Sequence, residues 1–234
     1  MPTPTIGQTI AALLFDIGAI TLRLQPPFRY RSGLWSPIYT DNRLLCSYPP
    51  ARHAVINAFV QLIREADLQP DVLAGVATAG IPHAAWIAHE LKLPMVYVRS
   101  EAKDHGKGHR IEGTLMPRGF IHHHPPHTLV IEDLITTGGG ALSTVEAVRA
   151  EGGLVSHCLA ICTYELPEAQ QAFEAAFVTL HPLCTFTDIL LTAESRRLLS
   201  PQDLKLASTW QADPVSWSRH YEATAHASHT NAHS

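Results

Sequence analysis

The feature that most constrains the fold is a regular alternation of helix-like and strand-like segments through the middle of the chain. Residues 52–66 carry apolar side chains at helical spacing, and the apolar run VLAGVA at 72–77 has the length of a buried strand. The alternation continues through helix-like residues 81–91 and 141–153 and strand-like residues 95–99, 128–133 and 155–164. Strands separated by helices form parallel sheets, so the sequence predicts one α/β sheet flanked by helices.

Composition and charge limit the class of protein. The chain has 234 residues and 46% hydrophobic content, which suffices for one sizeable core. A net charge of -4 does not provide the basic footprint of a nucleic-acid-binding domain. The apolar start of the chain is interrupted by Asp16 and Gly18, so we expect an amphipathic first helix rather than a membrane span.

The four cysteines contain no Cys-x-x-Cys pair and lie in apolar or strand-like stretches, where small buried thiols are common. They indicate a reducing compartment. With no run of about 18 apolar residues elsewhere, we expect a soluble cytoplasmic protein.

The most informative loop follows the strand at 128–133, since ligands of parallel α/β sheets bind at the carboxyl ends of the strands. There the chain reads EDLITTGGG, with two acids before a Thr/Gly loop and a predicted helix. Free backbone N–H groups, Thr hydroxyls and a helix N-terminus suit a phosphate monoester. No Lys follows the glycines and no Gly-x-Gly-x-x-Gly pattern occurs, so neither ATP nor NAD is the expected ligand.

The two acids, Glu132 and Asp133, would repel a second phosphate but accept hydrogen bonds from vicinal hydroxyl groups. A phosphate in the loop and a diol on the acids describe a ribose 5-phosphate unit. An alternative is that the acids merely cap the following turn.

Three segments carry a family resemblance. LVIEDLITTGGGAL at 129–142 resembles the phosphoribosyl diphosphate signature of the type I phosphoribosyltransferases. Residues 32–49 and 75–113 resemble the orotate phosphoribosyltransferases, and the likeness runs in order over about residues 10–195. The resemblance implies a type I phosphoribosyltransferase-like parallel sheet with a small N-terminal hood, and transfer of phosphoribose from phosphoribosyl diphosphate to orotate.

The chain then divides into three expected parts. Residues 1–50 would form an N-terminal helix and the hood of the base pocket, and residues 51–200 the donor-binding α/β core with a mobile catalytic loop at 100–113. Residues 201–234 lose periodicity and become rich in Ser, Thr, Ala and His. We expect a frayed C-terminal extension that is disordered at its end.

The resemblance assigns the donor to two loops. The segment ATAGIP at 77–82 matches the pyrophosphate loop, whose N–H groups face the diphosphate at the mouth of a helix; helix capping alone is the alternative. In the family this loop can hold a strained peptide, and Ala79 stands where Gly is commoner. The implied donor-binding residues are Glu132, Asp133, Ile135, Thr136, Thr137, Gly138, Gly139, Thr78, Ala79, Gly80 and Lys107.

Residues 99–113 contain three glycines and almost no apolar side chain, so we expect a loop that an anion orders, or else a solvated surface turn. The resemblance implies a catalytic loop that reaches the neighbouring subunit's site, hence a homodimer. Arg99, Lys103 and Mg²⁺ would stabilise the leaving diphosphate, His105 would give it a proton, and Asp133 would orient the ribose. Mg²⁺ is expected to be held mainly by substrate oxygens, with no protein metal cluster.

For orotate, the resemblance indicates Ser32 and Tyr39 in the hood and Thr136 on the phosphate side. Arg31 is the expected carboxylate partner, since its planar fork matches that group. Relatives usually carry a Lys in the hood stretch and an Arg near residues 161–167. This chain has Trp35, Tyr164 and Glu165 in those regions, so we expect its base contacts to differ.

Two other functions stay open. One is a non-catalytic regulator that senses phosphoribosyl diphosphate, and the other is a phosphoribosyltransferase for another base. Lys103 and His105 disfavour the regulator, and the Ser-Gly-x-x-Ser-Pro-x-Tyr pattern at 32–39 favours orotate. The run HHHPPH at 122–127 is expected to be a surface loop without a metal.

Overall fold

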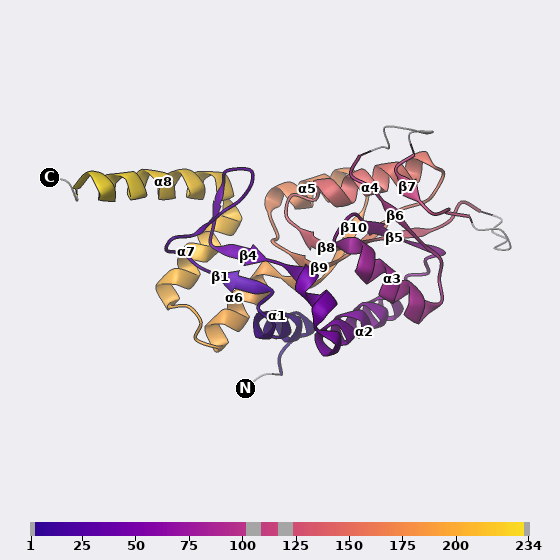
Figure 1. The fold of residues 1–234 in the computed structure, drawn as a ribbon, viewed down its shortest axis with the longest axis horizontal. Coiled ribbons are helices and arrows are strands. Elements are labelled where there is room, and N and C mark those ends of the chain that lie inside the picture. The colour runs from indigo at the N-terminus through magenta and orange to yellow at the C-terminus, as the bar shows by residue number, and fades with distance from the viewer. Residues whose placement is uncertain (1–2, 102–108, 117–123, 232–234) are drawn as a thin grey trace.

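A computed structural model describes residues 3–101, 109–116 and 124–231. Its centre is a six-stranded sheet in the order β10-β9-β8-β5-β6-β7, parallel throughout except for the β6–β7 pair. The strands are β5 (Val72–Val76), β6 (Met95–Val98), β7 (Ile111–Glu112), β8 (Thr128–Ile135), β9 (His157–Thr163) and β10 (Thr179–Thr185). The predicted parallel α/β sheet is confirmed, and Figure 1 shows it flanked by helices.

The two edge strands were not predicted. β7 is only two residues long, and β10 contains Pro182, which interrupts an apolar strand pattern. Proline has no N–H to donate to a neighbouring strand and is therefore tolerated mainly at sheet edges, which is where β10 lies.

Helices cover both faces of the sheet because side chains alternate along the strands. In β5, Leu73 joins the core beneath α1, α2, α3 and α6, whereas Val72, Ala74 and Val76 join the core beneath α4 and α5. The helices are α1 (Ile6–Asp16), α2 (Pro49–Glu65), α3 (Gly80–Leu91), α4 (Gly139–Ala150), α5 (Pro167–Ala175) and α6 (Phe186–Ser195). The predicted first helix is thus confirmed as α1.

Residues between α1 and α2 form small antiparallel pairs separate from the large sheet. β1 (Ile20–Leu22) pairs with β4 (Ile38–Thr40), and β2 (Phe28–Arg29) forms a hairpin with β3 (Trp35–Ser36). A 3-10 helix, η1 (Asn42–Ser47), leads into α2. We call residues 20–48 the hood.

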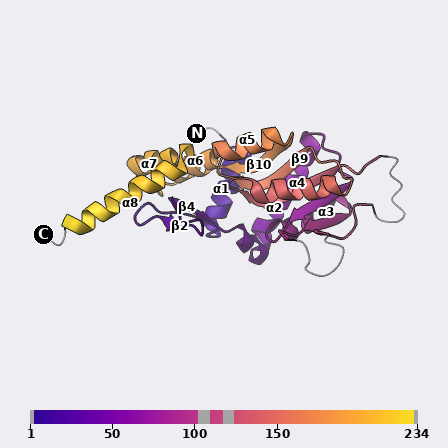
Figure 2. The ribbon, with the colours of Figure 1, turned by 90° about the horizontal axis from the view of Figure 1, so that it is seen from above.

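The expectation of a frayed segment after residue 200 is wrong for the part of it that the structure describes. The chain forms α7 (Pro201–Ala212) and α8 (Pro214–Asn231), and Ser200 caps α7 by accepting a hydrogen bond from the backbone N–H of Asp203. Trp210 and Trp217 are buried. Among the side chains that the structure describes, each helix buries few, and these do not form an apolar stripe in the sequence. In Figures 1 and 2, α8 projects from the body of the molecule at its far end.

All four cysteines are free thiols. Cys158, Cys162 and Cys184 are buried as expected, but Cys46 is exposed because it lies on η1 at the surface. None of the helices in the described residues is long and apolar enough to cross a membrane.

Candidate functional site

The carboxyl end of β8 carries the two predicted acids. β8 runs two residues beyond the predicted strand, to Ile135, so Glu132 and Asp133 lie within the strand near its carboxyl end. Glu132 is only 8% exposed, and its Oε2 is 3.5 Å from where a Cβ on Gly140 would lie. The Glu132 side chain therefore sits beneath the first turn of α4.

The loop after β8 ends at an open helix N-terminus. Gly138 precedes α4 with a φ of 84°, and a Cβ there would lie 2.8 Å from the ring of Phe173, so any side chain at this position would be strained. No side chain caps α4. The first N–H groups of a helix lack partners within the helix, and the helix dipole adds positive potential. Thr136, Thr137 and Gly138 thus lead into a cradle suited to an anion.

The second predicted loop lies directly beside this cradle. A Cβ on Gly80 would collide with the backbone carbonyl oxygen of Ile131, so glycine allows α3 to begin against β8. α3 also lacks a side-chain cap. The peptide bond between Ala77 and Thr78 is cis, and Ala79 adopts right-handed helical angles. The structure therefore brings residues 78–80 and the acids of β8 together.

Burial dominates the electrostatics of the acid pair. It raises the pKa of both Glu132 and Asp133, and the charge of Asp133 raises that of Glu132 further. Glu132 Oε1 accepts a hydrogen bond from the backbone N–H of Asp133 at 3.0 Å. Two desolvated carboxyl groups side by side favour ligands that bring hydroxyl donors or positive charge.

A buried asparagine, not predicted from the sequence, joins the hood to the acids. Asn42 is fully buried, and its Nδ2 donates to the backbone carbonyl of Asp133 at 2.8 Å. Its Oδ1 has no partner among the described residues. Nothing in the stretch YTDNR distinguishes Asn42 from a surface polar residue, because its burial depends on the docking of η1 against β8.

The remaining predicted residues that the structure describes lie after β6 and in the hood. Arg99 follows β6; its backbone N–H donates to the carbonyl of Arg110, and its guanidinium lies 3.8 Å from Glu112.

Arg31 and Ser32 are exposed at the tip of the β2–β3 hairpin, and Tyr39 is 43% exposed on β4. The hood that carries these three reaches the cradle through Asn42. The predicted residues Lys103, His105 and Lys107 lie outside the described residues.

Tyr164 and Glu165 serve structural contacts at the end of β9. The Tyr164 hydroxyl donates to Thr40 Oγ1 at 3.0 Å. Glu165 Oε2 accepts hydrogen bonds from the N–H and hydroxyl of Thr187 and from Gln211. These two residues connect β9 to the hood and to the C-terminal helices.

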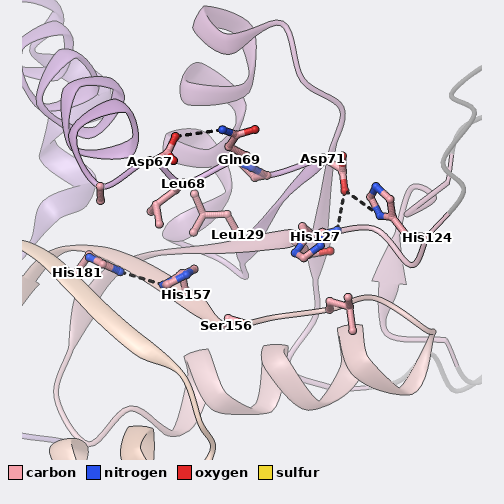
Figure 3. A pocket seen from close by; sticks show the side chains of 14 residues that line it. Asp67, Leu68, Gln69, Asp71, His124, His127, Leu129, Ser156, His157 and His181 are labelled. Carbon is pink, nitrogen blue, oxygen red and sulfur yellow. Dashed lines mark hydrogen bonds and ion pairs between the residues drawn. The ribbon is translucent and has the colours of Figure 1, made fainter.

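A hollow of about 710 Å³ lies at the opposite, amino-terminal edge of the sheet (Figure 3). Among the described residues, four histidines line it, of which His157 and His181 are hydrogen-bonded at 3.1 Å. Its lining includes none of the predicted site residues that the structure describes. Because parallel α/β sheets bind ligands at the carboxyl ends of their strands, the cradle at β8 is the candidate active site.

Fold and cradle together define a phosphoribosyltransferase, and the phosphoribosyl transferase domain family matches residues 47–173. The orotate phosphoribosyltransferase of Coxiella burnetii is 47% identical over 208 residues, covering 89% of this chain and 96% of the relative. That of Lactiplantibacillus plantarum is 42% identical, covering 91% and 97%. The crystal structure of the Aeropyrum pernix orotate phosphoribosyltransferase matches with a TM-score of 0.67 at 26% identity, covering 82% and 99%. The chain belongs to the orotate phosphoribosyltransferase family.

Proposed function

We propose that this chain transfers the phosphoribosyl group of phosphoribosyl diphosphate to orotate, giving orotidine 5′-monophosphate and diphosphate, in pyrimidine biosynthesis. The observation that carries the proposal is the carboxyl end of β8, where the buried Glu132 and the half-buried Asp133 lie shortly before the uncapped N-terminus of α4. Only the short loop at 136–138 separates this strand, whose acids can bind a diol, from the helix N-terminus, which can bind a phosphate. The names of the relatives support orotate as the acceptor.

In this proposal the donor lies across two helix N-termini. The N–H groups and hydroxyls of residues 135–139 bind the 5′-phosphate, and Glu132 and Asp133 accept hydrogen bonds from the ribose hydroxyls. Residues 78–80 bind the diphosphate at the start of α3. The support is the close packing of α3 on β8 at Gly80, which puts both helix N-termini at one edge of the sheet.

The proposal includes Mg²⁺. The acid pair fits a cation because both carboxyl groups are desolvated and gain from nearby positive charge. Glu132 and Asp133 would hold the ion through the ribose hydroxyls, while the diphosphate supplies its other oxygens. When bound, Mg²⁺ neutralises charge on the diphosphate.

The roles of the chain's own residues follow from the flow of charge. As the bond from the anomeric carbon to diphosphate breaks and the bond to the orotate nitrogen forms, positive charge grows on the ribose and negative charge on the departing oxygens. Asp133 orients and stabilises the ribose. Arg99 and Lys103 stabilise the diphosphate, and His105 gives a proton to its departing oxygen. The support for Arg99 is its position after β6, the neighbour of the strand that leads to Thr78.

Orotate binds in the hood, with Arg31 on its carboxylate and Ser32, Tyr39 and Thr136 around the ring.

We also propose a homodimer in which residues 100–113 of each subunit reach the partner's site. A cytoplasmic location is part of the proposal, supported by the four free cysteines.

A base panel tests this function. Purified protein, phosphoribosyl diphosphate and Mg²⁺ are combined with orotate, uracil, adenine or hypoxanthine, with a chelator in a parallel set. We expect loss of orotate absorbance only when orotate and Mg²⁺ are both present. Turnover of a purine instead would replace orotate as the substrate, and donor binding without turnover of any base would favour a sensor.

A further inference from the structure

All three polar groups of Trp35 are hydrogen-bonded to the two C-terminal helices. Its backbone N–H donates to Ser218 Oγ at 3.0 Å, and its indole N–H donates to Glu222 Oε1 at 3.0 Å. Its carbonyl accepts from the indole N–H of Trp210 at 3.2 Å. Ser218 and Trp210 are 4% and 2% exposed, so these bonds are largely shielded from water. We call Trp210, Ser218 and Glu222 the C-terminal clamp.

The indole ring of Trp35 is also held from two sides. Tyr221 of α8 lies 5.1 Å from it between ring centroids, and the guanidinium of Arg29 lies over the ring at 5.6 Å. Trp217 stacks on Tyr221 and donates its indole N–H to the carbonyl of Leu206 on α7. α8 is thereby fixed to α7 while it holds Trp35.

Trp35 belongs to a hairpin too short to be stable alone. β2 and β3 have two residues each, and Trp35 faces Arg29 across the pair. Isolated two-stranded hairpins are marginal in water even when longer. The tip of this hairpin carries Arg31 and Ser32, two of the residues proposed to bind orotate. Contacts outside the hairpin must therefore fix where these side chains lie.

Hydrogen bonds next to Trp35 also hold the backbone that precedes Tyr39, on the other side of the proposed base pocket. Ser36, next to Trp35, is fully buried, and its hydroxyl donates to the carbonyl of Ile38 at 3.0 Å. The Tyr30 hydroxyl donates to the same carbonyl at 2.8 Å. Tyr39 follows directly. A shift of Trp35 would therefore displace both the tip and Tyr39.

We propose that the C-terminal clamp positions the orotate-binding hairpin, so that Ser218 and Glu222, more than 180 residues from Trp35 in sequence, act as positioning residues for the base. This inference rests on the proposed function. In the described part of the chain, the hydrogen bonds of the clamp to Trp35 reach the hood and not the donor-binding loops, so loss of the clamp should affect the acceptor rather than the donor. Figure 2 shows α7 and α8 on the side of the hood, away from α3 and α4.

The test uses full-length variants with matched controls. Ser218→Ala removes the acceptor of the Trp35 backbone N–H, whereas Ser216→Ala changes an exposed serine two positions earlier on α8. Glu222→Leu removes the acceptor of the indole N–H, whereas Glu222→Gln keeps an acceptor oxygen at the same place. We expect Ser218→Ala and Glu222→Leu to raise the KM for orotate about five- to tenfold, since each removes one hydrogen bond. The KM for phosphoribosyl diphosphate and kcat should change less than about twofold, as should every constant in Ser216→Ala and Glu222→Gln.

A second readout does not depend on turnover. Amide hydrogen exchange of residues 28–40 should accelerate in Ser218→Ala and Glu222→Leu and stay at the wild-type rate in the two controls. Unchanged exchange in all variants overturns the clamp, as does an equal loss of donor and orotate affinity. If the wild-type protein turns over no orotate, the proposed function fails, and faster exchange in Ser218→Ala alone then still supports the clamp as a structural device.

Discussion

At the scale of single residues, the site depends on side chains that are costly to bury. Glu132 and Asp133 are adjacent acids in a nearly buried strand end, and burial raises the pKa of both. The Asn42 side chain donates a hydrogen bond to the backbone carbonyl of Asp133, while its amide oxygen has no partner among the described residues. Two desolvated acids and one unpaired amide oxygen all cost stability, so finding them together at one strand end marks a binding site rather than a core.

A buried histidine gives a prediction about acid stability. His83 on α3 is fully buried, neither ring nitrogen has a partner among the described residues, and burial lowers its pKa from 6.5 to about 4. The unfolded chain therefore takes up this proton first as the pH falls below 6.5. The free energy of unfolding therefore keeps its full value above pH 6.5. It falls as the pH drops toward 4, and His83 accounts for at most about 3 kcal/mol of this loss.

Urea unfolding at pH 7.0, 5.5 and 4.5 measures this loss. We expect the free energy of unfolding of His83→Gln to fall less over this range than that of the wild type. His53→Gln, which changes an exposed histidine on α2, should follow the wild type. Parallel pH curves for all three proteins would show that His83 does not contribute.

At the scale of elements, the close packing of α3 on β8 sets the distance between the two phosphate-binding loops. Gly80→Ala would push its methyl group into the Ile131 carbonyl oxygen, which cannot move without disturbing the central strand. We expect a loss of about 2 kcal/mol in the free energy of unfolding, together with weaker binding of phosphoribosyl diphosphate. Thermal unfolding and isothermal titration calorimetry measure the two effects.

Gly139→Ala is the matched control, since a Cβ at Gly139 meets nothing within 4 Å. Its stability should equal or exceed that of the wild type because the change restricts the unfolded chain. If Gly80→Ala were as stable as Gly139→Ala, the close approach of α3 to β8 would not be needed.

At the scale of the whole molecule, the proposed sharing of residues 100–113 between subunits predicts complementation. Lys103→Ala disables the loop and Asp133→Asn disables the core, so each variant alone should be nearly inactive. In a mixed dimer, one site combines an intact loop with an intact core. Random mixing should restore about a quarter of the wild-type activity, since half of the dimers are mixed and each has one working site.

The mixture is prepared by dissociating and re-forming both variants together, and each variant treated alone serves as the control. A mixture as inactive as its parents would mean that the loop acts within its own subunit. Light scattering on the same samples establishes whether the chain forms a dimer at all.

Sequence periodicity predicted the central strands and their helices because each element buries its own apolar face. It failed at β10, where Pro182 breaks the pattern, and after residue 200, where the helices bury isolated tryptophans. The acids and the Thr/Gly loop were identifiable because they lie in one continuous stretch of 129–142. The roles of the residues in 102–108 stay predictions.

The sequence by itself determined the order of the four central strands and of the helices between them, and the two loops at the carboxyl edge of the sheet, because these follow from neighbouring residues. Only the tertiary structure decided that Asn42 reaches Asp133, that Gly80 lies against Ile131, and that Trp35 is held by α7 and α8. Those contacts join residues 51 to 183 positions apart. Their partners are chosen by how whole elements pack, which no local pattern of side chains records.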